Sequence, residues 1–189
     1  MKKTSSESFH IAVTGHRFIS DEINFHHVIR QVLQDILKLH DMRDIYLYSA
    51  LAEGSDQLVA RISQEFEEIQ LRVPLPMPEE EYLADFATED GKAGFQKLLS
   101  TAIDVINLSS PGDCKDSYEA LGDYLVNHAD VLMALWNGVY NHKKGGTSEV
   151  VKAALQAGKP VYWIYCPNEK SDAKNIFESR KQIGDHEIL

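Results

Sequence analysis

Short apolar runs alternate with segments of helical periodicity along most of this chain, and this alternation is what most restricts its fold. The run from Val131 to Trp136 is apolar throughout, which predicts a strand buried on both faces of a sheet. Such strands need helices on both sides, so the alternation predicts a parallel sheet. Six runs are expected as strands: 9–14, 45–48, 71–75, 105–108, 131–136 and 161–165.

Helical patterns fill most of the gaps between these runs. From Ile23 to His40, apolar residues recur at the 3.6-residue spacing of a helix face. Further helices are expected around Leu58, Tyr118 and Val150. We therefore predict an α/β protein with a Rossmann-like three-layer fold and a mostly parallel sheet of about six strands. Residues 76–100 are acidic and contain proline, and they predict only short helical pieces; a lid over a site and an ordinary surface insertion remain alternatives.

Composition limits the classes of function. The 189 residues include 43% hydrophobic and 25% charged residues, which fits one domain over 1–189, with a core at 9–165 and a polar tail at 167–189. Cys114 and Cys166 are too few for a disulfide scaffold, so we expect a cytoplasmic location. We expect no membrane partner, no metal and no cofactor, since no apolar run is long enough for a span and the histidines lack zinc spacing.

The net charge restricts the partners. Nineteen basic residues against 29 acidic ones give a formal charge of -10. A large nucleic-acid footprint would need a basic face, so nucleic acid is not an expected partner. A small anionic ligand needs only a local cluster of donors. The broad helix faces are compatible with a homodimer.

The segments that follow the strands are where a parallel sheet binds its ligand. The first strand runs into Thr14-Gly15-His16-Arg17. Gly15 lets the backbone approach a ligand, His16 offers a hydrogen bond, and Arg17 offers a forked contact to a phosphate. The alternative is a tight turn with an arginine in solvent.

The second strand runs into a serine- and glycine-containing segment, 49–56, that precedes a helix. We expect Ser49, Gly54, Ser55 and Asp56 to line the sugar side of a ligand, with backbone N–H groups at the helix start facing it. Glu53 is expected to bond sugar hydroxyls. For Asp56, capping of the helix dipole stays an equal alternative.

The fifth strand leads through Asn137 and Gly138 to the double glycine of Gly145-Gly146-Thr147-Ser148-Glu149, which opens a helix. Two glycines let the backbone curl around an oxyanion, and the helix N-terminus adds a positive dipole end. The neighbouring segment His142-Lys143-Lys144 adds positive charge. This loop is therefore predicted to bind phosphate, together with Asn137, Gly138 and Ser148. Simple helix capping, with Glu149 reaching back, is the alternative.

Together, these three motifs resemble the SLOG superfamily, which unites the DNA-processing protein A (Smf) proteins with the Lonely Guy (LOG) cytokinin-activating enzymes. The resemblance spans residues 9–165. It implies a Rossmann-like sheet that binds a nucleotide or a nucleotide-derived ligand of the AMP or ADP-ribose type, in a sensor or processing domain. LOG enzymes carry P-G-G-x-G-T-x-x-E, whereas this chain has Val150 at the glutamate's position and Glu149 one residue earlier.

A second resemblance covers only the C-terminal third. The segments at 129–131, 146–149 and 158–161 are similar to nucleoside 2-deoxyribosyltransferases, which use a glutamate nucleophile. The alternative function is thus an enzyme, a nucleotide N-glycosidase or phosphoribohydrolase, with Glu149 as the catalytic residue and Glu53 or Asp56 as a second carboxylate. The sequence leaves open whether turnover occurs.

Overall fold

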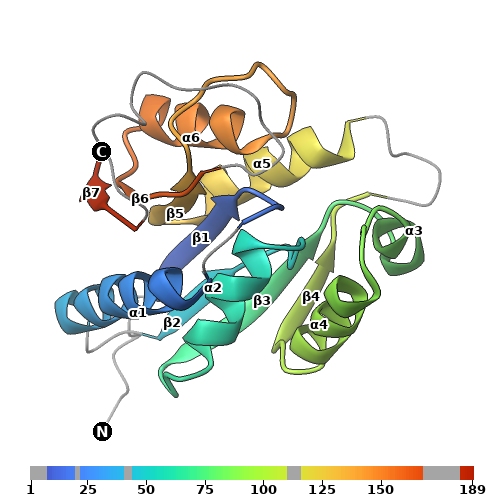
Figure 1. The fold of residues 1–189 in the computed structure, drawn as a ribbon, viewed down its shortest axis with the longest axis horizontal. Coiled ribbons are helices and arrows are strands. Elements are labelled where there is room, and N and C mark those ends of the chain that lie inside the picture. The colour runs from blue at the N-terminus through green and yellow to red at the C-terminus, as the bar shows by residue number, and fades with distance from the viewer. Residues whose placement is uncertain (1–7, 20–21, 41–43, 110–115, 168–183) are drawn as a thin grey trace, which may run out of the picture.

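The computed structural model describes residues 8–19, 22–40, 44–109, 116–167 and 184–189, in which one sheet has the strand order β4-β3-β2-β1-β5-β6-β7 (Figure 1). All neighbouring strands are parallel except β6 and β7. The strands are β1 (Phe9–Gly15), β2 (Ile45–Tyr48), β3 (Ile69–Leu75), β4 (Asp104–Asn107), β5 (Val131–Trp136), β6 (Val161–Tyr165) and β7 (His186–Ile188). The predicted fold class is confirmed, and the sheet has one strand more than expected.

Helices cover both faces of the sheet (Figure 1). They are α1 (Glu22–Leu39), α2 (Ser55–Ser63), α3 (Glu79–Ala84), α4 (Glu89–Leu99), α5 (Ser117–His128) and α6 (Thr147–Gln156). One core packs α1, α2 and α4 against the sheet, and a second core packs α5 and α6 against the other face. In β5, Met133 belongs to the first core and Leu132 and Ala134 to the second. The strand is thus buried on both faces, as its composition predicts.

The acidic segment after β3 is more helical than expected. It forms α3 and α4, and α4 has 11 residues. The hydroxyl of Thr88 accepts a hydrogen bond from the Gly91 N–H and so caps α4. The two glycines weaken the sequence signal for this helix, but Gly91 has a packing reason. A Cβ there would come within 2.2 Å of the Glu53 carboxylate.

The seventh strand comes from the tail that the sequence marks only as polar. β7 pairs antiparallel with β6, and backbone hydrogen bonds fix it, including that from the Leu189 N–H to the Val161 carbonyl. All three β7 side chains are exposed, so the sequence has no alternation of apolar and polar residues from which this strand could be predicted. Residues 168–183 and Cys114, on which other predictions rest, lie outside the described residues. Within the described residues, no helix is long and apolar enough to cross a membrane.

The strand order indicates where an open α/β sheet of this kind would bind a ligand. β1 has β2 on one side and β5 on the other, so the chain reverses its direction of progress across the sheet at β1. The crevice at such a switch point, outside the carboxyl ends of the strands, is where open α/β sheets bind ligands.

Candidate functional site

A cavity of about 370 Å³ lies at the carboxyl ends of β1 and β5. Its walls come from the turn after β1, from α3 and α5, and from the loop that leads into α6. Its apolar lining consists of side chains such as Val13, Ala50, Leu121, Leu125 and Val150. The volume falls within the range of roughly 300–1,000 Å³ that is typical of small-molecule sites.

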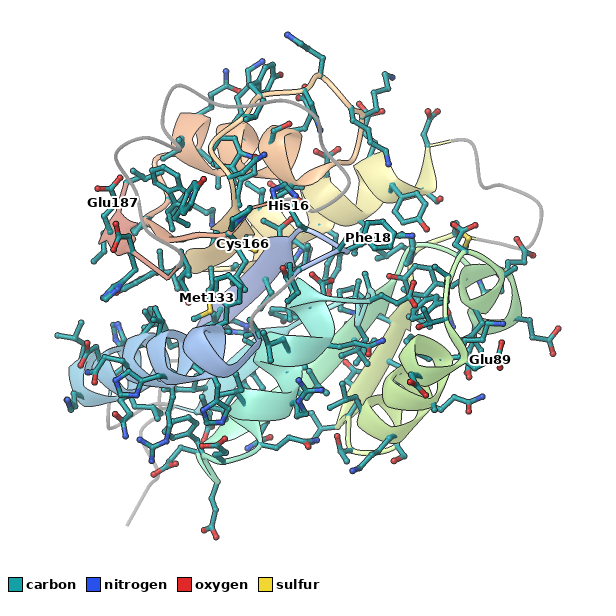
Figure 2. All side chains as sticks on the ribbon, viewed as in Figure 1. His16, Phe18, Glu89, Met133, Cys166 and Glu187 are labelled. Carbon is teal, nitrogen blue, oxygen red and sulfur yellow. The ribbon has the colours of Figure 1, made fainter. Side chains whose placement is uncertain are left out.

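The turn after β1 brings Gly15, His16 and Arg17 to the cavity wall. A Cβ at Gly15 would come within 2.4 Å of the Ser55 Cβ, so glycine lets this turn pack directly on α2. His16, labelled in Figure 2, is buried, and its Nε2 accepts a hydrogen bond of 3.1 Å from the Asn137 backbone N–H. Burial lowers the pKa of His16 to about 4, although a side-chain hydrogen bond with Asn137 acts in the opposite direction. The ring is therefore neutral at pH 7.

Arg17 projects into the cavity and is held by two helices. Its Nη2 donates to the Tyr118 hydroxyl at 3.0 Å, and its Nη1 donates to the Asp85 carbonyl at 3.4 Å. The Tyr118 hydroxyl in turn donates to the Asp85 carboxylate at 2.6 Å. These contacts fix the guanidinium between α3 and α5, where it keeps further N–H donors for a ligand.

Most of the second motif supports the site from behind rather than lining it. The Ser55 hydroxyl donates to the His16 carbonyl at 2.9 Å, and Ser49 donates to the Asp56 carbonyl at 3.2 Å. Gly54 has a φ of 81°, and a Cβ there would lie 2.3 Å from the Arg17 carbonyl oxygen. Ser49, Gly54 and Ser55 thus lock the start of α2 onto the turn that carries Arg17, and none of the three lines the cavity.

Glu53 is engaged away from the cavity. Its carboxylate accepts hydrogen bonds from the Ala87 and Thr88 N–H groups, at 2.7 and 3.0 Å, and from the Thr88 hydroxyl at 2.7 Å. Although burial acts in the opposite direction, these bonds lower the pKa of Glu53. The carboxylate ties the loop before α4 to the second motif, and Glu53 itself does not line the cavity.

Asp56 is the carboxylate of the second motif that lines the cavity. Its side chain lies in the wall with only 8% of the residue exposed. Burial raises its pKa to about 7, while the charge of Arg17 and a hydrogen bond from the Ala52 backbone act in the opposite direction. An acidic group that titrates near neutrality in a cavity is a feature of functional sites.

Tyr82 of α3 supplies a polar group that the described residues leave without a hydrogen-bond partner. The residue is fully buried and lines the cavity, and its hydroxyl has no hydrogen-bond partner among the described residues. The ring packs edge-to-face on Phe86 and Phe95, which fixes its position. A buried hydroxyl without a partner is destabilising by about 1–3 kcal/mol, so its presence needs a reason.

The loop before α6 forms the opposite wall. Gly145, Gly146, Thr147 and Ser148 all line the cavity, together with Lys143 and Lys144. Gly145 has a φ of 65°, and a Cβ there would lie 2.5 Å from the Tyr118 backbone, so glycine brings the loop against the same helix that holds Arg17.

Some polar groups of this loop already form hydrogen bonds within the loop. The Gly146 N–H donates to the Lys143 carbonyl at 2.9 Å, and the Ser148 hydroxyl donates to the Asn141 side chain at 2.9 Å. The next N–H groups, of Thr147 and Ser148, take part in no hydrogen bond between described residues. They belong to the set of N–H groups that a helix N-terminus leaves without intrahelical partners, and both residues line the cavity.

Glu149 and Val150 point in different directions at the start of α6. Glu149 accepts a hydrogen bond from the Tyr140 hydroxyl, and Lys152 donates to the same hydroxyl at 3.0 Å. Val150, by contrast, lines the cavity. Successive residues of a helix differ by about 100° in direction, so the carboxylate is turned away from the position that faces the ligand space.

Asn137 and Gly138 shape the turn after β5. The Asn137 side chain accepts from the Val139 N–H at 3.0 Å, and Gly138 has a φ of 79°. Neither lines the cavity. Their contribution is indirect, because the Asn137 N–H orients the buried His16 ring.

Tyr82, Asp85 and Tyr118 are cavity residues that the sequence analysis did not predict as site residues. Tyr118 reads only as an apolar position on a helix face, and α3 lies in the segment for which a lid was one alternative. The lid alternative was the available signal, since Tyr82 of α3 and Asp85, which directly follows α3, both line the cavity. In the described parts of the chain, no group of three His, Cys, Asp or Glu side chains is placed to hold a metal ion.

Comparisons with known proteins bear on the fold. No family model matches this chain, and no curated protein does. Among solved structures, the X-ray structure of TM1055, a structural-genomics target, is similar with a TM-score of 0.50 and 15% sequence identity. The match covers 81% of this chain and 72% of that chain. At this identity the similarity shows the fold alone, a Rossmann-like α/β architecture.

Proposed function

We propose that this protein binds a nucleotide or nucleotide-derived ligand, of the AMP or ADP-ribose type, at the carboxyl ends of its strands. The observation that carries the proposal is one cavity with the N-terminus of α6 on one wall and Arg17 on the other. A helix N-terminus and a guanidinium are complementary to a phosphate group. The apolar lining offers a surface for a base.

Local charge supports an anionic ligand. Arg17, Lys143 and Lys144 all line the cavity in a chain with a formal charge of -10. The acidic side chains of the lining are Asp56 and Asp85, so basic groups outnumber acidic ones at the cavity although they are the minority in the chain. This local balance favours a small anion over a long polyanion, which would also contact the acidic surface.

We further propose that the chain is a SLOG-type domain acting as a sensor or processing module. The proposal is supported by the strand-end motifs that resemble that superfamily, since Gly15 to Arg17, Asp56 and Gly145 to Ser148 line one cavity. The geometry does not favour the enzymatic alternative with Glu149, whose carboxylate bonds Tyr140. The position that faces the cavity holds Val150, which supplies no acid or base.

Thermal unfolding with and without ligand tests the proposal. AMP or ADP-ribose at 100 times its dissociation constant should stabilise the protein by about 2.7 kcal/mol. Adenosine, which lacks the phosphate, should stabilise it much less. The absence of any shift with millimolar AMP and ADP-ribose contradicts the proposal.

A pair of glycine variants provides the matched control. Gly145 and Gly158 both have positive φ, 65° and 69°, and they flank the two ends of α6. A Cβ at Gly145 collides with Tyr118, whereas one at Gly158 meets no atom within 4 Å. Both alanine variants carry the backbone strain, but only Gly145→Ala should lose the stabilisation by AMP.

A further inference from the structure

The part of the cavity lined by Tyr82 and Asp56, here named the inner end, has a composition that phosphate binding does not explain. Tyr82 of α3 and Asp56 of α2 both line the cavity, and they lie near enough for the charge of Asp56 to act on the Tyr82 hydroxyl. Tyr82 is fully buried, with 0% of the residue exposed, and Asp56 is 8% exposed. A carboxylate repels a phosphate, so this end suits a different part of the ligand.

Two groups at this end need hydrogen-bond partners. The Tyr82 hydroxyl has none among the described residues, while the Asp56 carboxylate accepts from the Ala52 backbone and keeps further lone pairs. Burial leaves both groups short of water. A ligand that presents adjacent hydroxyl groups would satisfy both, because a hydroxyl donates to a carboxylate and accepts from a phenol.

Arg17 links this end to the phosphate wall. Its guanidinium is bound to Tyr118, the residue against which Gly145 packs, and its charge acts on both Asp56 and Tyr82. A phosphate between Arg17 and the start of α6 therefore has its attached sugar within reach of the inner end. This order of groups, phosphate and then vicinal hydroxyls, is that of a ribonucleotide.

We propose that Asp56 and Tyr82 bind the 2′- and 3′-hydroxyls of a ribose and make the site selective for ribonucleotides over deoxyribonucleotides. This inference rests on the proposed nucleotide site. Selectivity follows because a ligand lacking one hydroxyl leaves a buried polar group of the protein unpaired.

Calorimetric titration of the full chain with AMP, 2′-deoxy-AMP and 3′-deoxy-AMP tests the assignment. We expect the wild type to bind AMP about 10- to 100-fold more tightly than either deoxy form, as for loss of a hydrogen bond to a buried or charged group. Tyr82→Phe and Asp56→Asn should weaken AMP binding and reduce this preference to within about 3-fold.

Controls separate the assignment from a loss of fold. Tyr82→Phe keeps the ring that packs on Phe86 and Phe95, so its melting temperature without ligand should not fall. Tyr124→Phe removes a hydroxyl from α5 outside the cavity lining and should leave the preference unchanged.

The outcomes distinguish this inference from the proposed function. Equal affinity for AMP and both deoxy forms overturns ribose recognition and leaves the nucleotide site standing. A preference that survives in both variants overturns the roles of Asp56 and Tyr82. If no binding of AMP, its deoxy forms or ADP-ribose is detected, both the nucleotide site and the inference are wrong.

Discussion

The substitution Asp56→Asn should stabilise the folded protein at neutral and alkaline pH while weakening its site. Asp56 is buried in the cavity wall, and its pKa rises from 3.8 to about 7, chiefly through burial. The unfolded chain then loses this proton at lower pH than the folded protein does. At about 1.4 kcal/mol per pKa unit, the folded state is destabilised by about 4 kcal/mol once the pH exceeds 7.

The sign of the effect fixes its pH dependence. The raised pKa contributes stability below pH 3.8, and this contribution is lost as the pH rises through about 7. Asparagine has no such titration, and its side-chain oxygen can still accept from Ala52. The variant should therefore be more stable than the wild type by about 2 kcal/mol at pH 5 and about 4 kcal/mol at pH 8.

Urea denaturation of both proteins at pH 5 and pH 8 measures this difference. Comparison with the wild type at each pH is essential, since the lowered pKa of His16 also makes stability depend on pH. Asp123→Asn, at an exposed position of α5, should change the stability by less than about 0.5 kcal/mol. An Asp56→Asn protein no more stable than the wild type at pH 8 refutes the reasoning.

Three further outcomes are expected. Titration calorimetry should find that Arg17→Ala weakens AMP binding by about 1.5–3 kcal/mol, with little loss of melting temperature. Arg30→Ala on α1 should leave AMP affinity unchanged. Unchanged affinity together with lost stability in Arg17→Ala would make Arg17 structural. Fluorescence anisotropy should find no tight single-stranded DNA binding at physiological salt, and a submicromolar, salt-sensitive complex would contradict this. Chromatography should detect little adenine released from AMP; release that Glu149→Gln abolishes, with binding retained, would establish an enzyme.

The sequence by itself determined the fold class and the edge of the sheet at which the cavity lies. Burial imposes a period of 2 or 3.6 residues on a strand or helix, and that period is local, so runs such as Val131–Trp136 could be placed without knowing their neighbours. The topology rule for parallel sheets then located the strand ends, where Arg17 and Gly145 meet at one cavity. The same helical period gave the different directions of Glu149 and Val150.

Local patterns could not give what depends on contacts between distant segments. β7 exists because its backbone pairs with β6 and not because its side chains alternate. Glu53 and Asp56 stand three residues apart in one motif, yet the first binds the loop before α4 and the second faces the cavity. Only the packing of α2 against its neighbours separates them.

The inner end of the cavity was also decided by tertiary structure alone. Tyr82 lies 26 residues beyond Asp56 in the chain, in a segment whose sequence pattern predicted little. It reaches the cavity because α3 packs beside the crevice, where its ring lies against Phe86 and Phe95 and its hydroxyl has no partner among the described residues. Which polar groups face one another across a cavity depends on how whole elements dock, and no local period in the sequence encodes that.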